Sequence, residues 1–176
     1  MSDNQQQEAL NYFNSHADNW RAKAEGAFET LVNVIEQRND FIVAVAKEMS
    51  SCRTFLDAGC GTGELVCEIA QLDTESVGVD YAPEMIQLAQ KLAAERGLEN
   101  AKFECSSILE YEMLPDHYDL IGANGFIEYI SQPDLFLFFD QVAAALVKGG
   151  SFVFGSRNRL FNLASMNKYT LHEVKS

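Results

Sequence analysis

The sequence predicts an α/β protein in which an open, doubly wound and mostly parallel sheet carries helices on both faces. Short apolar runs alternate along the chain with longer segments in which apolar residues recur every three or four positions. The first run ends in a glycine-rich turn, FLDAGCGTGE, which leads into a helical segment. Alternation of strand and helix favours parallel pairing through right-handed crossovers.

The N-terminal quarter of the chain, residues 1–50, is predicted to form a helical cap. Apolar side chains recur at helical spacing in residues 5–20 and again in residues 26–48. The second segment places them on an approximate stripe: Phe28, Leu31, Val32, Ile35, Ile42 and Val45. We therefore expect helices ahead of the first strand.

The first half of the predicted sheet follows the cap. Thr54–Ala58 is a short apolar run that indicates a strand, and Glu64–Leu72 has helical spacing. Ser76–Asp80 is the next expected strand. Pro83 suits the first turn of the helix that follows, and Gly97 suits the position just after its end.

The second half of the sheet contains three more expected strands. Ala101–Cys105 is the third strand, and Tyr118–Ala123, which is strongly apolar, is the fourth. A helix is expected over Pro133–Val147, closed by two glycines, with the fifth strand at Ser151–Gly155. In such sheets ligands bind at the carboxyl ends of the strands, near the point where the strand order reverses.

Composition and charge restrict the function. The chain has 176 residues, which is enough for one domain with a sizeable core. No stretch approaches the ~20 apolar residues that cross a bilayer, and the N-terminus has no signal-peptide pattern, so we expect a cytoplasmic location. The net charge of −13 repels phosphate backbones and anionic lipids, which disfavours nucleic-acid and membrane partners.

The cysteines and histidines do not predict a metal site. The four cysteines form no C-x-x-C pair, and the three histidines are scattered along the chain. These spacings do not match zinc sites. We expect the cysteines to be reduced and to pack as small apolar residues.

The glycine-rich turn restricts the kind of ligand. Dinucleotide-binding turns prefer G-x-G-x-x-G, but the third glycine position here is Glu64, whose charge is unfavourable beside a pyrophosphate. The observed spacing is D-x-G-x-G-x-G, with Asp57 two residues before Gly59. An acid at that position suits a ligand with an ammonium group, which disfavours a nicotinamide dehydrogenase.

Several segments, taken together, resemble the class I S-adenosylmethionine-dependent methyltransferases. FLDAGCGTGE resembles the family's motif I, and VGVDYAPEM resembles its second strand with the acidic end. FECSSILEYEMLPDHYDLIGANGFIEYI resembles the adenine-side loop and the fourth strand, and LVKGGSFVFGSRNR the turn into the fifth. NYFNSHADNW is similar to the N-terminal cap segment. The resemblance covers roughly residues 11–160 and implies a Rossmann-like core.

The resemblance implies a site for S-adenosylmethionine, with S-adenosylhomocysteine as the product. Asp57 would hold the methionyl ammonium group. Asp80 would accept both ribose hydroxyls, because its two carboxylate oxygens match a cis-diol. The turn would line the methionyl and ribose portions with four residues: Gly59, Cys60, Gly61 and Gly63. Cys60 also fits the role of a small packing residue.

On the adenine side, the resemblance places Tyr81 and Met85 beside the ring and Ile108 over its other face. Both Tyr81 and Met85 also fit a plain core role. Where the family often has an aspartate for the adenine amino group, this chain has Ser106 and Ser107. Ser107 has the better register, and a serine can accept that hydrogen bond without a charge.

The implied reaction is in-line transfer of a methyl group to an O, N, C or S acceptor. Asn124 and Gly125 would sit near the sulfonium. The leaving group is a neutral thioether, so catalysis rests largely on positioning. A base is needed only for a protonated acceptor, and the candidates are His16 and Glu128. We expect neither to be indispensable.

The chain is expected to comprise the cap, a cofactor-binding core over residues 51–157, and residues 158–176 as the start of an insert or a truncated tail. Class I folds have seven strands, and strands 6 and 7 are expected to be missing. An uncovered sheet edge favours pairing with another chain, so a homodimer or a missing partner domain is a candidate partner beside the small-molecule acceptor. Two functions stay open: a small-molecule methyltransferase, and a non-catalytic module that binds the same cofactor.

Overall fold

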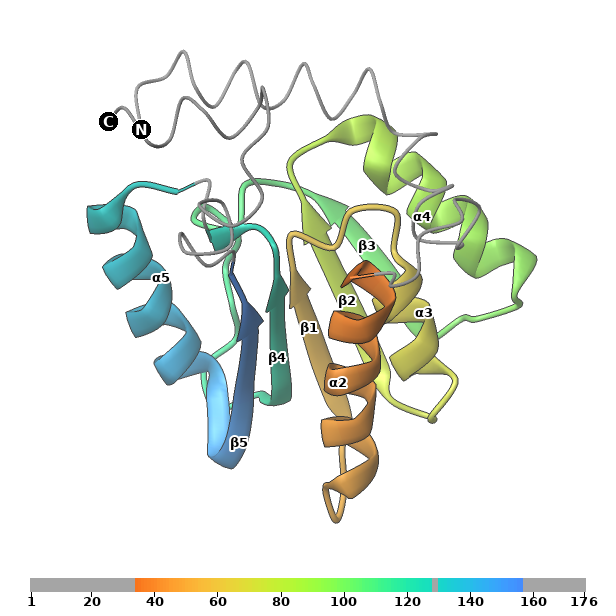
Figure 1. Ribbon diagram of the computed structural model, residues 1–176, viewed down its shortest axis with the longest axis horizontal. Coiled ribbons are helices and arrows are strands. Elements are labelled where there is room, and N and C mark those ends of the chain that lie inside the picture. Colours follow the sequence, from red (N-terminus) through yellow and green to blue (C-terminus); the bar gives the residue numbers. More distant parts are fainter. Residues whose placement is uncertain (1–33, 128–129, 157–176) are drawn as a thin grey trace.

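The computed structural model describes residues 34–127 and 130–156, which form one sheet with helices on both sides (Figure 1). In chain order the elements are α2 (Val34–Glu48), β1 (Thr54–Ala58), α3 (Glu64–Ala70), β2 (Glu75–Asp80), α4 (Pro83–Glu95), β3 (Ala101–Cys105), β4 (Tyr118–Asn124), α5 (Gln132–Ala145) and β5 (Leu146–Gly155). The expected segments at residues 5–20 and 158–176 lie outside the described residues.

The sheet has the strand order β3-β2-β1-β4-β5, and every described pair of strands is parallel. This confirms the predicted doubly wound α/β fold. The chain moves outward from β1 to β2 and β3, then returns to the other side of β1 for β4 and β5. The strand order therefore reverses between β1 and β4, where ligands bind in sheets of this kind.

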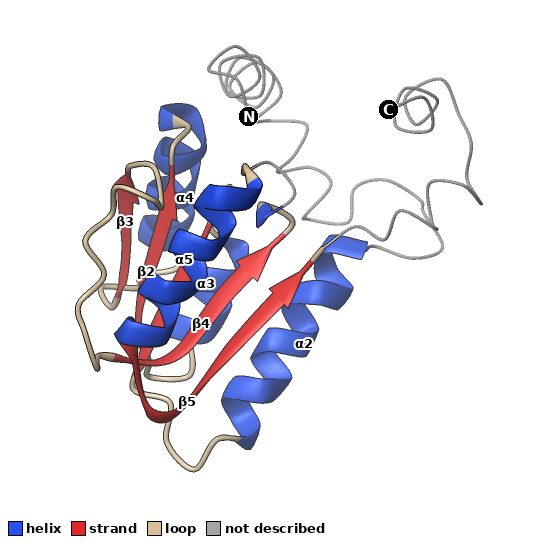
Figure 2. Cartoon of the chain, turned by 90° about the vertical axis from the view of Figure 1, so that its left-hand side faces the viewer, coloured by secondary structure: helices blue, strands red, loops and turns tan. Residues whose placement is uncertain are grey.

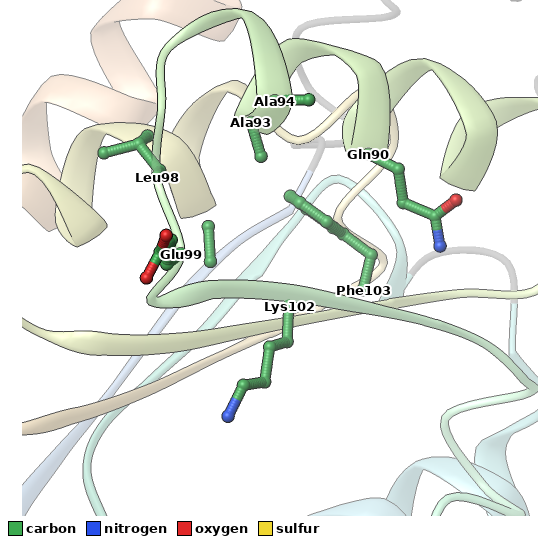
Figure 3. A pocket seen from close by; sticks show the side chains of 8 residues that line it. Gln90, Ala93, Ala94, Leu98, Glu99, Lys102 and Phe103 are labelled. Atoms are coloured by element: carbon green, nitrogen blue, oxygen red, sulfur yellow. The ribbon is translucent and has the colours of Figure 1, made fainter.

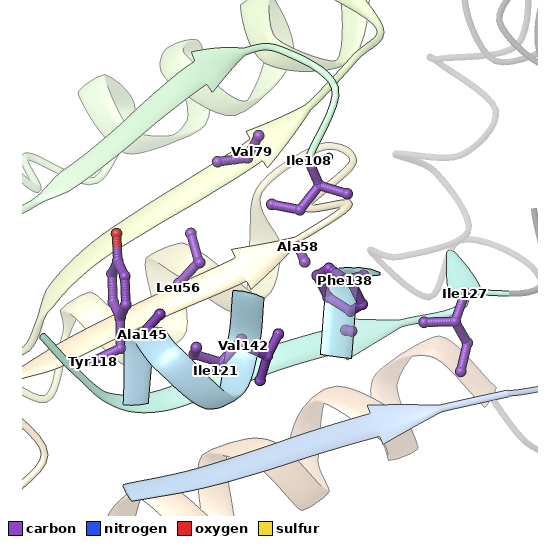
Figure 4. Close-up of a cluster of buried hydrophobic side chains, with 11 residues drawn as sticks. Leu56, Ala58, Val79, Ile108, Tyr118, Ile121, Ile127, Phe138, Val142 and Ala145 are labelled. Atoms are coloured by element: carbon purple, nitrogen blue, oxygen red, sulfur yellow. The ribbon is translucent and has the colours of Figure 1, made fainter. Parts of the chain in front are cut away.

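Helices cover the two faces of the sheet differently (Figure 2). One face packs on α2, α3 and α4 through a cluster that includes Ile42, Phe55 and Leu65. The other face packs on α5 through a cluster that includes Leu56, Ile121 and Phe138 (Figure 4). Adjacent residues Phe55 and Leu56 point into opposite clusters, as the alternation of side chains along a strand requires.

Strand β4 lies between β1 and β5 and is buried from Tyr118 to Ala123. Its one carboxylate in that stretch, Asp119, accepts hydrogen bonds from the backbone at the start of β1. The Asp119 Oδ2 atom accepts hydrogen bonds from the backbone N–H groups of Arg53 at 2.9 Å and Thr54 at 3.0 Å. A buried carboxylate paired in this way joins β1 to β4 at their amino ends.

The two glycines at 149 and 150 do not close helix α5, which corrects one sequence-based expectation. The helix ends at Ala145, and β5 begins at Leu146 and includes both glycines. Tyr118 pairs with Leu146, whereas Leu120 pairs with Ser151, so extra residues of β5 bulge out of the ladder. Gly149 has φ of 86°, a backbone conformation that favours glycine.

Helix α4 begins and ends at the residues that the sequence indicates. Pro83 occupies the first turn of α4, and Gly97, with φ of 67°, follows its end, as the sequence predicts. Among the described residues, no helix is both long and apolar enough to cross a bilayer.

Candidate functional site

The turn between β1 and α3 is fixed to the end of β2. The backbone N–H groups of Gly59 and Cys60 both donate to the Val79 carbonyl oxygen, at 2.8 and 3.1 Å. Gly59, Gly61 and Gly63 all have positive φ, of 76°, 52° and 82°. The motif therefore forms a tight turn at the carboxyl edge of the sheet.

Two glycines of this turn serve different purposes. A Cβ atom on Gly63 would lie 2.7 Å from Ala89 Cβ and 2.8 Å from Phe103 Cε1, so its absence lets α3 pack closely. A Cβ atom on Gly61 would meet nothing within 4 Å. The turn is therefore packed behind Gly63 and open at Gly61, where a ligand can approach the backbone.

Asp80, at the end of β2, faces the same turn. Its Oδ2 atom accepts a hydrogen bond from the Gly61 N–H at 3.0 Å, and its Oδ1 atom accepts one from the Ala82 N–H at 2.9 Å. Burial raises the pKa of the carboxyl group, although these hydrogen bonds oppose the rise. The carboxylate keeps lone-pair capacity that a ligand hydroxyl can use.

Asp57 is the buried acid of the site, with 3% of its surface exposed. Its Oδ1 atom is buried without a hydrogen-bond partner among the described residues. Burial, followed by the nearby charges of Asp80 and Glu64, raises the pKa of Asp57 to about 8. An orphaned buried carboxyl oxygen of this kind suits a cationic hydrogen-bond donor.

The adenine-side candidates gather around the end of β2. Tyr81 is 37% exposed, whereas Met85 and Ile108 are buried. The Ser106 N–H donates to the Asp80 carbonyl oxygen at 3.0 Å, and the Ser107 carbonyl oxygen accepts two backbone hydrogen bonds from the turn that follows. The serine pair therefore lies beside the strand that carries Asp80.

Helix α2 brings two polar residues to the end of β4 that the sequence reasoning missed. Asn124 Nδ2 donates to Asn39 Oδ1 at 3.3 Å. A Cβ atom on Gly125 would lie 3.2 Å from the Arg38 Nη1 atom, so the guanidinium group lies against that glycine. Both residues occupy the three-to-four-residue spacing between Ile35 and Ile42, and polar residues in an apolar stripe were the available signal.

Cys60 packs against β2. A Cβ atom on Gly78 would lie 2.8 Å from the Cys60 Sγ atom, so the thiol fills the space above that glycine. Burial raises the pKa of the Cys60 thiol well above its usual range, which keeps it neutral. The thiol is therefore an inert part of the turn. The base candidates His16 and Glu128 lie outside the described residues.

A hollow of about 540 Å³ lies elsewhere, between the C-terminal half of α4 and the amino end of β3 (Figure 3). Ala93, Leu98 and Phe103 are among the residues that line it. The glycine-rich turn, Asp57 and Asp80 lie at the opposite ends of the strands. This hollow is therefore separate from the candidate site.

Comparison with known proteins identifies relatives of this chain. The methyltransferase domain family matches residues 49–175. The chain is 30% identical over 132 residues to the mitochondrial ubiquinone biosynthesis O-methyltransferase of Schizosaccharomyces pombe, covering 73% of this chain and 48% of that protein. It is 28% identical over 128 residues to the ajmaline N-methyltransferase of Rauvolfia serpentina, covering 72% and 44%.

A solved structure shows the same fold. Magnesium protoporphyrin IX methyltransferase from Synechocystis PCC 6803, with bound S-adenosylmethionine, superposes with a TM-score of 0.64 at 24% identity, covering 81% of this chain and 72% of that one. The chain spans about half the length of the curated relatives it matches. The family match covers most of the chain, which therefore belongs to the class I S-adenosylmethionine-dependent methyltransferase domains.

Proposed function

We propose that the protein transfers the methyl group of S-adenosylmethionine to a small-molecule acceptor. The observation that supports this most directly is a pair of carboxyl groups at neighbouring strand ends, Asp57 and Asp80, with the open backbone of Gly61 beside Asp80. The cofactor carries an ammonium group and a ribose diol, which are complementary to two such carboxyl groups. Diphosphate ligands are disfavoured because Glu64 stands where dinucleotide-binding turns have their third glycine.

The chain's residues can be assigned to the parts of the cofactor. Asp57 accepts hydrogen bonds from the methionyl ammonium group, and Asp80 accepts them from the ribose hydroxyls. Arg38 pairs with the methionyl carboxylate, since its guanidinium group lies against Gly125 at the neighbouring strand end. Gly59, Cys60, Gly61 and Gly63 line the path between these groups.

The remaining candidates surround the adenine and the reacting centre. Tyr81, with its exposed ring, and Ile108 lie on either side of the adenine, and Ser107 accepts a hydrogen bond from its amino group. Met85 supports this pocket from the buried face of α4. Asn124, held by Asn39, lies beside the sulfonium.

Bound S-adenosylmethionine supplies a methyl group on a positively charged sulfur. The protein's part is to hold that group in line with the acceptor and to exclude water. Because the leaving thioether is neutral, no residue has to donate a proton to it. His16 and Glu128 are the candidates that would remove a proton from the acceptor.

A small acceptor fits the charge of the chain better than a nucleic acid does. The net charge of −13 opposes the approach of a polyanion. Two relatives are named for ubiquinone biosynthesis and for ajmaline, which are small-molecule contexts. We extend that acceptor class to this chain.

Calorimetry and an acceptor screen test the proposal together. We expect S-adenosylhomocysteine to bind the purified protein in calorimetry, and NADH not to bind. Incubation with S-adenosylmethionine and a panel of phenols, amines and thiols should give a methylated product by mass spectrometry. Binding without product from any acceptor would favour the non-catalytic module, and absence of binding would refute the proposed cofactor.

A further inference from the structure

Three carboxyl groups gather around the glycine-rich turn, and one oxygen of one of them is left without a partner. Asp80 accepts backbone hydrogen bonds, and Glu64 accepts one from the Thr62 hydroxyl group at 2.7 Å. Asp57 Oδ1, by contrast, is buried and has no hydrogen-bond partner among the described residues. The geometry of the free site thus leaves Asp57 as the group with the most to gain from a ligand.

The charges that act on Asp57 come from the acids of the site. Asp80 on β2 and Glu64 at the start of α3 both disfavour its ionised form. The Cys60 thiol in the turn is held neutral by burial. The cation on α2 that faces this end of the sheet is Arg38, whose guanidinium group lies against Gly125. A buried carboxyl group between two other acids is held in its protonated form.

Apart from Asp80 at the end of β2, the neighbouring strands add no titratable side chain next to Asp57 among the described residues. Gly78 of β2 and Gly122 of β4 stand opposite it in the sheet. The ionisable residues of β4, Tyr118 and Asp119, belong to the amino end of that strand. At the start of α4, Glu84 is exposed and adds only further negative charge.

We propose that the free protein keeps a proton on Asp57 and that binding of the cofactor's ammonium group expels it to solvent. This inference rests on the proposed function. In the free state Asp57 is a carboxylic acid; in the complex it is a carboxylate paired with the ammonium group, and one proton has left for the buffer. Binding of the methionyl part is therefore linked to pH at this residue.

The linkage has a defined direction. The pKa of Asp57 is raised to about 8 in the free protein, so below that pH the carboxyl group carries a proton. Binding must then remove this proton, which lowers the affinity for the cofactor. Each unit of falling pH then weakens binding about tenfold. Above that pKa the carboxylate exists before binding, and the affinity no longer rises. The ligand's own amino group titrates near ~8, so pH 5.5 to 7 isolates Asp57.

Calorimetry can count the proton directly. We would titrate S-adenosylhomocysteine at pH 7 in buffers of different ionisation enthalpy, and expect about one proton released per ligand, with affinity about tenfold weaker at pH 6. The matched ligand is 5′-methylthioadenosine, which has the nucleoside and the thioether but no amino-acid part. It should bind without proton release and with equal affinity at both pH values.

An Asp57→Asn variant assigns the proton. Binding of 5′-methylthioadenosine reports that its site is folded, and S-adenosylhomocysteine should then bind without proton release or pH dependence. Release that persists in the variant would overturn the assignment to Asp57. If the unmodified protein binds S-adenosylhomocysteine without releasing a proton, this inference fails and the proposed function stands. If neither ligand binds at any pH, both fail.

Discussion

Asp80 Oδ2 accepts a hydrogen bond from the Gly61 N–H at 3.0 Å, which links the end of β2 to the middle of the glycine-rich turn. The same carboxylate also accepts the Ala82 N–H through its other oxygen. Both oxygens are therefore oriented before any ligand arrives. Pre-orientation of this kind lowers the entropy that binding has to overcome.

Removal of the Asp80 carboxylate should abolish tight cofactor binding. In Asp80→Ala, two charge-assisted hydrogen bonds to the ribose are lost, each worth about 1.5–3 kcal/mol. We expect affinity for S-adenosylhomocysteine to fall at least about 100-fold in calorimetry. Glu84→Ala removes an equal charge from the exposed start of α4 and should change affinity less than about threefold. Equal losses in both variants would contradict the assigned role.

A side chain at Gly63 should destabilise the fold. In Gly63→Ala the new Cβ atom would lie 2.7 Å from Ala89 Cβ, at a φ of 82° that disfavours other residues. Strain and overpacking together should lower the free energy of unfolding by about 2–4 kcal/mol in urea. Gly97→Ala is the control, because its φ of 67° is similar but its Cβ would meet nothing within 4 Å. It should lose only about 1 kcal/mol.

The contacts of Asp119 with Thr54 should stabilise the sheet without affecting the ligand. Thr54 Oγ1 lies 3.0 Å from Asp119 Oδ2, and the Asp119 N–H donates to Thr54 Oγ1 at 3.1 Å. We expect Thr54→Val to lose about 1–2 kcal/mol and Asp119→Ala about 2–4 kcal/mol of unfolding free energy. The double variant should lose less than the sum, since the two share these bonds. A change in cofactor affinity beyond about twofold would show that this end of the sheet communicates with the site.

The free energy of unfolding should decrease as the pH rises from about 4 towards 8. The pKa of Asp57 is raised to about 8 in the folded protein, whereas an unfolded aspartate titrates near ~3.9. Between these values the folded state binds the extra proton, so the free energy of unfolding decreases with pH by up to about 1.4 kcal/mol per unit. Urea melts from pH 5 to 7.5 measure this slope, which Asp57→Asn should flatten. Asp116→Asn, at an exposed turn, should leave it unchanged.

Arg38 should matter for the amino-acid part of the cofactor alone. Arg38→Met keeps an unbranched apolar stem but removes the guanidinium group, so S-adenosylhomocysteine should bind at least about tenfold more weakly. Affinity for 5′-methylthioadenosine, which lacks a carboxylate, should stay the same. Arg53→Met removes a cation next to the amino end of β1 and serves as the control. An equal loss for both ligands would mean that Arg38 supports the local structure instead.

The strands were the most predictable part of the fold. Thr54–Ala58 and Ala101–Cys105 have the bounds that the sequence predicts. Thr54–Ala58 is a largely apolar run that ends at glycines, whereas Ala101–Cys105 alternates apolar residues with Lys102 and Glu104. The predicted boundary between α5 and β5 was wrong, because two adjacent glycines usually indicate the end of a helix. Here the pairing of this segment with β4 outweighed the local signal of the glycines. Gly149, with its positive φ, lies in the bulge of β5.

The glycine-rich turn and its acids could be located from sequence, because they follow strands and share a recognisable spacing. Arg38 and Asn39 could not, because helical periodicity identifies the face of a helix and does not say which strand end it reaches. The orphaned state of Asp57 Oδ1 was also hidden. It depends on which donors the fold brings within reach of that oxygen, and the spacing of residues along the chain does not show this.

Helix α2 extends from the site into the core, and this couples cofactor binding to the stability of the fold. Arg38 lies over Gly125 near its first turn, while Ile42 and Ala46, further along, are buried against β1 and β4. A ligand that binds the guanidinium group of Arg38 therefore also stabilises helix α2, whose buried residues pack in the protein core. Cofactor retention and resistance to heat are then expected to vary together among variants of this helix, including those that never touch the ligand.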